Sequence, residues 1–407
     1  MMDENKFDLF APFDQGKCTL CGECFSQCPV MHLPIDEAKK EMERLIAGKE
    51  TKYVLQKCTS CFVCNFICPE HCNPTQLILD RWHEKYLQEG LPSRAEWFIP
   101  HYKPNFRTYV LDRLPEEEKE MLKAWDNLSP CEEMFYPGCN IITSPYLTRT
   151  SLLDGLEIRG SLDTCCSEMY YRMGLFDQVE QAAKRLDAYF RKLGVKKMVI
   201  PCTAGYNMFT NVLPRFGFKP DFEIQHLLVR LWERIEDGRI EIKNKLGMKV
   251  TIQDSCYGKI FGAEILDLPR KLLERIGVEV VEERYCRQNS LCCGIAGGFS
   301  PESGYSPTRI VSSTIRSLRE AKATRAGAIV TYCAGCLQML STVHTFYPTG
   351  MPIYHILEML QMAIGEKPAR RQGQRGRSQL VGTLVNQSPK LISKKRFRVK
   401  QIEQEWA

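Results

Sequence analysis

The segment 18-CTLCGECFSQCP-29 spaces four cysteines as C-x2-C-x2-C-x3-C-P, and 58-CTSCFVCNFICP-69 repeats that spacing. Three thiolates on one tight loop can bind three irons of a cubane [4Fe–4S] cluster, whereas the fourth is turned away because proline restricts the backbone before it. Where two clusters share a protein, the fourth cysteine binds the other cluster. The sequence therefore predicts one cubane on Cys18, Cys21, Cys24 and Cys68, and another on Cys58, Cys61, Cys64 and Cys28.

Zinc knuckles and disulfides are the alternatives for these cysteine runs. Zinc sites use one or two C-x2-C pairs and lack the repeated triple run with a trailing proline. The chain holds 20 cysteines in 407 residues, but its first residues lack the pattern of a signal peptide, and no apolar stretch reaches the length of a membrane helix. We therefore expect reduced thiols in a cytoplasmic protein of an organism that is anaerobic at least part of the time.

The positive charge of the chain is concentrated near its C-terminus. Overall, 55 Lys and Arg face 49 Asp and Glu, yet residues 367–407 hold 11 basic and two acidic residues, leaving 44 against 47 elsewhere. This basic tail is interpreted either as a solvated, disordered extension or as an arm that docks an acidic partner subunit. No aromatic residues alternate with the charges, so nucleic-acid binding is not expected.

The pattern of apolar residues divides the chain into five parts. Two amphipathic stretches, 35–50 and 75–90, predict an all-helical ferredoxin module over residues 1–95, followed by a linker over 96–130. From Cys131 short apolar strands alternate with longer helices, which favours an α/β fold with parallel sheets. Predicted strands are 133–136, 197–201, 248–253, 278–281 and 327–332, and predicted helices include 176–193, 265–276, 308–322 and 356–364.

An internal repeat divides the α/β region into two domains, 131–245 and 246–366, before the tail at 367–407. The first copy carries Cys139, the pair Cys165–Cys166 and Cys202, and the second carries Cys256, the pair Cys292–Cys293 and Cys333 at offsets of 117, 127 and 131 residues. The single cysteines follow predicted strands, and parallel sheets place ligand sites at the carboxyl ends of their strands. Buried apolar cysteines are the alternative, but they explain a duplicated set poorly.

The second copy resembles a known family. Its spacing Cys256-x35-Cys292-Cys293-Gly294-x38-Cys333-x2-Cys336, within NSLCCGIAGG and TYCAGC, is similar to the CCG motif of heterodisulfide reductases. Joined to a helical two-cluster module, it resembles the D subunit of that family, a fusion of the C and B subunits of the soluble enzyme. The resemblance implies one noncubane [4Fe–4S] centre, catalytic in disulfide reduction, on Cys256, Cys292, Cys293, Cys333 and Cys336.

The first copy departs from that motif in two places. Ser167 replaces the glycine after the cysteine pair, and Gly205 stands where the last cysteine is expected. The four remaining thiols, on Cys139, Cys165, Cys166 and Cys202, hold either a further cluster or none. In the second copy Tyr257 stands where relatives often carry histidine. Cys72, Cys131 and Cys286 lie outside every motif and are interpreted as packing residues.

Two functions are consistent with these observations. The chain is either an electron-transfer subunit that relays electrons between the two cubanes and the noncubane centre, or an enzyme that reduces a small-molecule disulfide at that centre. No flavin, nucleotide or P-loop motif is present, so electrons must come from or go to other redox subunits. The resemblance implies flavoprotein, hydrogenase-like or reductase partners. A third interpretation, in which the clusters only stabilise the fold, fits the repeated cubane spacing poorly.

Overall fold

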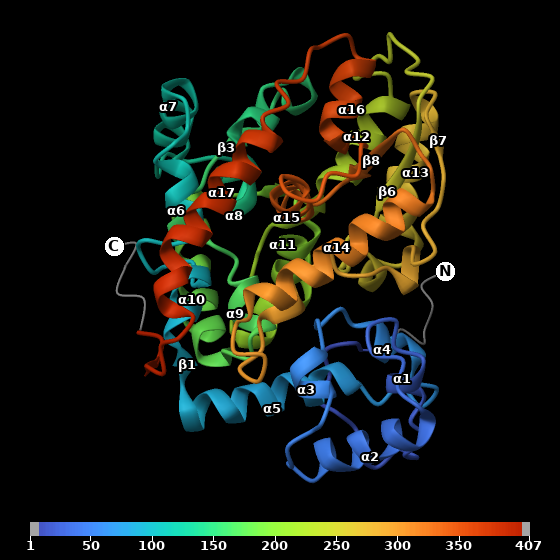
Figure 1. Ribbon diagram of the computed structural model, residues 1–407. Helices are drawn as coiled ribbons and strands as arrows, with labels where there is room; N and C mark the ends of the chain where they lie inside the picture. The colour runs from blue at the N-terminus through green and yellow to red at the C-terminus, as the bar shows by residue number, and fades with distance from the viewer. Residues whose placement is uncertain (1–7, 401–407) are drawn as a thin grey trace.

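The computed structural model describes residues 8–400, which form a helical module, two α/β lobes and a C-terminal strap (Figure 1). The helical module contains α1 (Glu23–Ser26), α2 (Ile35–Ile46), α3 (Val54–Lys57), α4 (Val63–Ile67) and α5 (Pro74–Glu89). In α2 the buried residues Ala38, Met42 and Leu45 recur every three or four positions, so one face packs inward. α5 begins with a proline and ends before Gly90, whose positive φ of 69° stops the helix.

The first lobe, residues 131–245, is built on a four-stranded parallel sheet with the order β3-β2-β4-β5. Its strands are β2 (Glu133–Phe135), β3 (Glu157–Ile158), β4 (Lys197–Ile200) and β5 (Glu223–His226). Its helices are α8 (Gly138–Ile142), α9 (Glu168–Arg172), α10 (Phe176–Leu193), α11 (Thr203–Asn207) and α12 (Leu227–Glu236). β4 is central, and its last three residues are fully buried because helices cover both faces of the sheet.

The second lobe, residues 246–366, repeats this topology with the order β7-β6-β8-β9, again all parallel. Its strands are β6 (Lys249–Gln253), β7 (Glu279–Val280), β8 (Ala328–Thr331) and β9 (Ile353–His355). Its helices are α13 (Ala263–Arg275), α14 (Pro307–Ala323), α15 (Ala334–His344) and α16 (Ile356–Ala363). The predicted α/β class with parallel sheets is confirmed, whereas β3, β5 and β9 were not predicted.

The segment expected to be a linker is structured. Residues 91–130 contain β1 (Leu91–Pro92), a short 3-10 helix (Ser93–Phe98), α6 (Phe106–Leu111) and α7 (Glu116–Trp125). Asn105 caps α6, since its side chain accepts hydrogen bonds from the backbone of Arg107 and Thr108 at 2.8 and 3.0 Å. α6 thereby fixes Arg107, whose side chain is 1% exposed, against the interior of the two lobes.

The C-terminal strap, residues 367–400, differs from the predicted solvated extension. α17 (Gln372–Gln387) packs between α15 and α6, and β10 (Arg396–Phe397) pairs antiparallel with β1 (Figure 1). Arg371 and Arg375 bind Glu118 of α7, whose side chain is fully buried. Basic residues of the strap therefore neutralise acidic residues of this chain, so fewer of its positive charges remain for an acidic partner. Residues 401–407 of the predicted tail lie outside the described residues.

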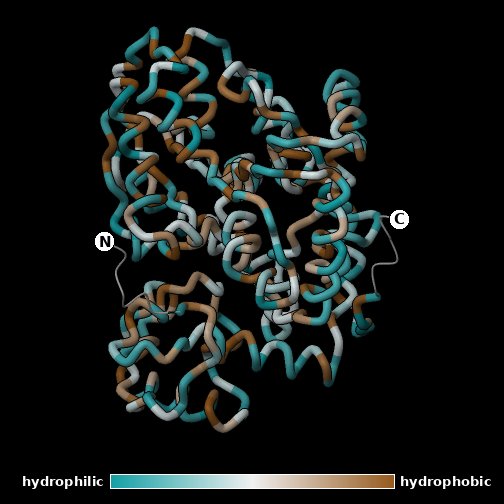
Figure 2. Tube along the Cα trace, turned by 180° about the vertical axis from the view of Figure 1, so that it is seen from behind, coloured by the Kyte–Doolittle hydropathy of each residue, from teal (hydrophilic) through white to brown (hydrophobic). Residues whose placement is uncertain are grey.

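Hydrophobic residues form a core that runs through all of these parts. Along the peripheral helices, hydrophobic and hydrophilic residues alternate, as the tube in Figure 2 shows. Among residues 8–400 no helix combines the length and the apolar composition that crossing a bilayer requires. The fold thus brings the helical module, both lobes and the strap into contact around one shared interior.

Candidate functional site

The helical module contains two cavities, each bordered by the four thiols of one predicted set, and Cys72 also lines the first. The first, of about 330 Å³, is lined by Cys18, Cys21 and Cys24 of the first run together with Cys68 of the second. The second, also of about 330 Å³, is lined by Cys58, Cys61, Cys64 and Cys28. These are the same two sets that the crossed arrangement of the fourth cysteines predicts.

The backbone of both loops takes the same unusual form. Leu20 and Ser60, each just before the second cysteine of its run, have φ values of 56° and 44°, and Gly22 and Phe62, each just after it, have 80° and 65°. Left-handed residues turn consecutive N–H groups toward a concavity, which favours an anion there. In the second loop the Ser60 amide donates to Cys58 Sγ at 3.3 Å. Both loops are therefore shaped to receive a negatively charged group.

The thiols themselves need a metal to ionise. Burial raises the pKa of Cys28 to about 11 and that of Cys64 to about 12, so both are neutral at physiological pH unless a metal deprotonates them. Within residues 8–400, no three His, Cys, Asp or Glu side chains are gathered tightly enough for a single metal ion. Four thiols around a cavity suit a polynuclear cluster, and this donor set fits a [4Fe–4S] group.

A third cavity, of about 740 Å³, lies between the two α/β lobes. All nine motif cysteines of the repeat line it: Cys139, Cys165, Cys166, Cys202, Cys256, Cys292, Cys293, Cys333 and Cys336. Cys202 and Cys333 begin α11 and α15 at the carboxyl ends of the central strands, and their Sγ atoms are 3.9 Å apart. The two lobes therefore face each other across their cysteine edges, and we call this space the shared cavity.

The five cysteines of the second lobe form an unbroken chain of thiol contacts. Hydrogen bonds join Cys256 to Cys292, Cys292 to Cys293, Cys293 to Cys336, and Cys336 to Cys333. The contact with Cys292, followed by burial, raises the pKa of Cys256, whereas hydrogen bonds with Cys292 and Cys336 lower the pKa of Cys293. This arrangement fits a single centre with five thiolate ligands.

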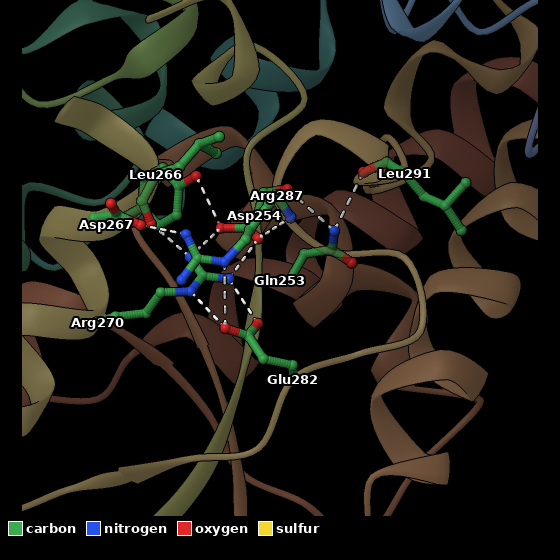
Figure 3. A network of polar contacts seen from close by, with 9 residues as sticks. Gln253, Asp254, Leu266, Asp267, Arg270, Glu282, Arg287 and Leu291 are labelled. Atoms are coloured by element: carbon green, nitrogen blue, oxygen red, sulfur yellow. Dashed lines mark hydrogen bonds and ion pairs between the residues drawn. The ribbon is translucent and has the colours of Figure 1, made fainter. Parts of the chain in front are cut away.

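A buried carboxylate holds the three segments that carry these cysteines (Figure 3). Asp254 follows β6 and accepts two hydrogen bonds from Arg270 of α13, at 3.0 and 2.8 Å. It also accepts from the backbone amide of Arg287 at 2.8 Å and from the Tyr332 hydroxyl at 3.1 Å. Tyr332 directly precedes Cys333, and Asp254 lies two residues before Cys256. The Asp254 side chain therefore ties the segments of Cys256 and Cys333 together, and through Arg287 it orients the loop before Cys292.

The second ferredoxin loop contacts the shared cavity directly. Arg172 of α9 donates to the carbonyl of Thr59 at 3.2 Å and contacts Cys256 Sγ at 3.6 Å, while Glu168 accepts from its Nε at 2.6 Å. Lys259, which is 1% exposed, donates to the carbonyls of Cys61 and Ser290 at 3.2 and 2.8 Å. Two buried cations therefore join the loop of Cys58 and Cys61 to the five-cysteine site.

Several residues near these sites escaped prediction from the sequence. Arg107 enters the shared cavity from a segment that carries no motif, and Arg172 enters it from α9, which follows the Cys165–Cys166 pair. His226 and His355 occupy equivalent positions in the lobes, each accepting the amide hydrogen bond that begins the helix after its strand. Their offset of 129 residues lies within the range of the cysteine offsets, so the repeat could have revealed them.

The three unassigned cysteines lie in different surroundings. Cys72 lines the first cubane cavity, where its amide donates to Cys68 Sγ at 3.4 Å, so it is more than a distant packing residue. Cys131 is buried beside β2 and Cys286 is partly exposed, and neither lines a cysteine cavity described above.

Comparison with protein families identifies two of these parts. Residues 12–69 match the 4Fe-4S dicluster domain, and residues 250–341 match the cysteine-rich domain named CCG. The predictions of 4Fe–4S clusters in the helical module and of a CCG domain in the second lobe are thereby confirmed at that level. An iron–sulfur, electron-transferring oxidoreductase is the class of protein that these two domains indicate.

Curated proteins with similar sequences have names in the same class. The chain is 24% identical to the EtfAB:quinone oxidoreductase of Syntrophomonas wolfei over 73% of its own length and 44% of that protein. It is 26% identical to the probable iron–sulfur-binding oxidoreductase FadF of Bacillus subtilis, over 79% and 48%. An uncharacterised iron–sulfur protein of Methanocaldococcus jannaschii is 24% identical, over 78% and 66%. The chain spans about half the length of the first two; their names do not include heterodisulfide reductase, so that narrower resemblance stays a prediction.

Proposed function

We propose that this chain is an electron-transfer subunit of a larger oxidoreductase complex. In this proposal Cys18, Cys21, Cys24 and Cys68 hold one cubane cluster, and Cys58, Cys61, Cys64 and Cys28 hold the other. Cys256, Cys292, Cys293, Cys333 and Cys336 hold a noncubane [4Fe–4S] centre. Such groups accept and release one electron at a time, and their potential responds to nearby charge and hydrogen bonds.

The contact of Arg172 with both Thr59 and Cys256 is the observation that carries this proposal. It places a permanent positive charge between the second ferredoxin loop and the first cysteine of the five-cysteine site, in an interior from which water is excluded. A positive charge there stabilises additional negative charge on either side, more strongly than it would in water. The chain's own residues thus connect the two sites and make both receptive to an electron.

Reduction or formation of a disulfide in the shared cavity is a second candidate. The shared cavity is bordered by the polar groups of Arg107, Asn140 and Tyr257. Reduction of a disulfide takes two electrons and two protons and releases two thiols, so a one-electron relay would have to act twice. In this candidate the disulfide is the substrate, and the redox partner subunits supply the electrons.

An anaerobic redox titration followed by EPR tests the proposal. We expect reversible one-electron signals from both cubanes and a further centre that Cys293→Ser removes without affecting the cubanes. Cys131→Ser is the matched control, because Cys131 is equally buried but lines none of the three cysteine cavities. If Cys293→Ser leaves every signal unchanged, the five-cysteine centre is not formed.

Adding a thiol–disulfide pair to the same sample separates the two candidates. A new paramagnetic species that requires the thiol and disappears in Cys293→Ser supports catalysis in the shared cavity. Signals that respond only to the redox mediator support the electron relay alone.

A further inference from the structure

Arg107 is a buried cation whose charged surroundings are Glu168 and the thiols of the first lobe. It is 1% exposed and lines the shared cavity, and its Nε and Nη1 atoms are buried without a hydrogen-bond partner in the described chain. Its side chain is hydrogen-bonded to Cys139. A buried guanidinium is stabilised by nearby negative charge, and thiolates on Cys139 and Cys165 would add to the charge of Glu168.

The thiols of the first lobe are the groups that can supply that charge. Hydrogen bonds join Cys139 to Cys165 and Cys165 to Cys166. The fourth thiol, on Cys202, begins α11 at the end of β4 and lines the same cavity. Thiols become anionic in such an interior when a metal displaces their protons. Arg107 and these four cysteines therefore form one donor set with a matching positive charge.

The second lobe has the same arrangement. Cys256 corresponds to Cys139 in the repeat, and its Sγ lies 3.6 Å from Arg172 Nη2. Each of the two equivalent cysteines thus has an arginine beside it, which in both cases comes from outside the loop that carries the cysteine. Arg172 is also paired with Glu168 at 2.6 Å, whereas the unpartnered atoms of Arg107 leave its charge available to the thiolates.

Gly205 lacks the thiol that would be a fifth ligand, but its neighbours have not closed in on this position. A Cβ at Gly205 would have Ile200, Cys202 and the Sγ of Cys166 as neighbours at 3.5, 3.8 and 3.9 Å, which is ordinary contact. The packing around Gly205 therefore leaves room for a Cβ. Four thiolates are also the number that ordinary four-iron clusters use.

We propose that the first lobe holds a four-iron cluster on Cys139, Cys165, Cys166 and Cys202, with Arg107 as its buried counter-charge. The Cys202–Cys333 contact of 3.9 Å would make this cluster the immediate neighbour of the five-cysteine site. The relay proposed above needs only the helical module and the second lobe, so the two proposals can fail separately.

Iron and acid-labile sulfide, counted per chain in the anaerobically purified full chain, test this inference. With a fourth cluster we expect about 16 irons in the unaltered protein and about 12 in Cys165→Ser, since each cluster contributes four. The control Cys131→Ser should retain the full count. An unchanged count in folded Cys165→Ser overturns the inference.

Two further measurements keep the test decisive. If Cys293→Ser leaves the count unchanged while Cys165→Ser removes four irons, the inference stands and the proposed function fails. If Cys165→Ser does not fold, about 16 irons in the unaltered protein support a fourth cluster, and about 12 together with four lost in Cys293→Ser overturn it.

The role of Arg107 has a separate readout. Arg107→Gln should either lose four irons or move the midpoint potential of one centre to a more negative value, because removal of a positive charge disfavours the reduced form. Arg107→Lys keeps the charge and should restore most of the change. Identical iron content and potentials in Arg107→Gln and the unaltered protein would exclude Arg107 as the counter-charge.

Discussion

Gly294 and Ser167 occupy equivalent positions after the paired cysteines, and both have positive φ, at 107° and 63°. They differ in what approaches them. A Cβ at Gly294 would lie 2.0 Å from Thr314 Oγ1 and 2.5 Å from the Thr314 amide nitrogen of α14. Ser167 is accommodated, and its hydroxyl donates to the carbonyl of Cys165 at 3.4 Å. The glycine of the second lobe is therefore required by the packing of α14 on the cysteine loop, as well as by its backbone conformation.

Gly294→Ala is expected to destabilise the protein by about 3 kcal/mol, because the new Cβ meets backbone that cannot move aside independently. Loss of the iron–sulfur absorbance in increasing urea measures the effect. Gly194→Ala is the matched control: Gly194 has φ 63° but nothing within 4 Å of its Cβ position, so only about 1 kcal/mol of backbone strain is expected. Equal effects of the two substitutions would contradict the packing argument.

At the scale of elements, α7 and α17 are joined by charges that the sequence places far apart. Glu118 lies on the inner face of α7, where Arg371 and Arg375 reach it from the start of the strap. Arg375 is itself 4% exposed, and α17 crosses α15 so closely that a Cβ at Gly376 would lie 2.5 Å from the carbonyl of Ser341. The strap therefore belongs to the core of the fold and stabilises the helix that follows Cys333.

Glu118→Gln should lower the free energy of unfolding by about 3 kcal/mol, since it leaves the buried Arg375 without its carboxylate, whereas Arg371 keeps its ion pair with Glu117. Urea unfolding measures this, and limited proteolysis should show faster cleavage near α17. Glu120→Gln, on the exposed face of the same helix where the residue pairs with Lys123, should change the stability far less because water screens that ion pair. A strap that is solvated in solution would give two equally small effects.

At the scale of the whole molecule, the helical module and the second lobe meet at buried polar contacts as well as apolar ones. Phe62 of the second ferredoxin loop packs against Tyr257 with ring centroids 5.6 Å apart, and the Tyr257 hydroxyl donates to Glu168 at 2.8 Å. Glu168 in turn holds Arg172. Tyr257 thus helps to position the arginine that joins the two sites.

If the five-cysteine centre is formed as proposed, Arg172→Gln should lower its midpoint potential by about 60 mV, the equivalent of about 1.4 kcal/mol for a one-electron couple. Electron exchange with the cubanes should slow as a consequence. Potentiometric EPR and anaerobic stopped-flow absorbance measure the two effects. Arg191→Gln, which alters an exposed ion pair with Asp187, is the control. An unchanged potential would show that Arg172 serves folding alone.

The sequence by itself determined the local features of this protein. The C-x2-C-x2-C-x3-C-P runs determined which four motif thiols come together at each cavity of the helical module, since short loops with fixed spacing permit few arrangements. The long periodic segments also determined the central strands β2, β4, β6 and β8 and helices such as α10. Edge strands such as β3 and β7 are two residues long, so β3 escaped detection because it is too short to show a period.

Only the tertiary structure decided how these parts meet. It brought both cysteine sets of the repeat into one cavity, placed Arg107 and Arg172 beside Cys139 and Cys256, and folded the basic strap onto Glu118. The cysteine spacing predicts ligands because metal binding within one loop is a local property. Which distant charge compensates them depends on the packing of segments 30 to 250 residues apart, where burial forces each charge to find an opposite one.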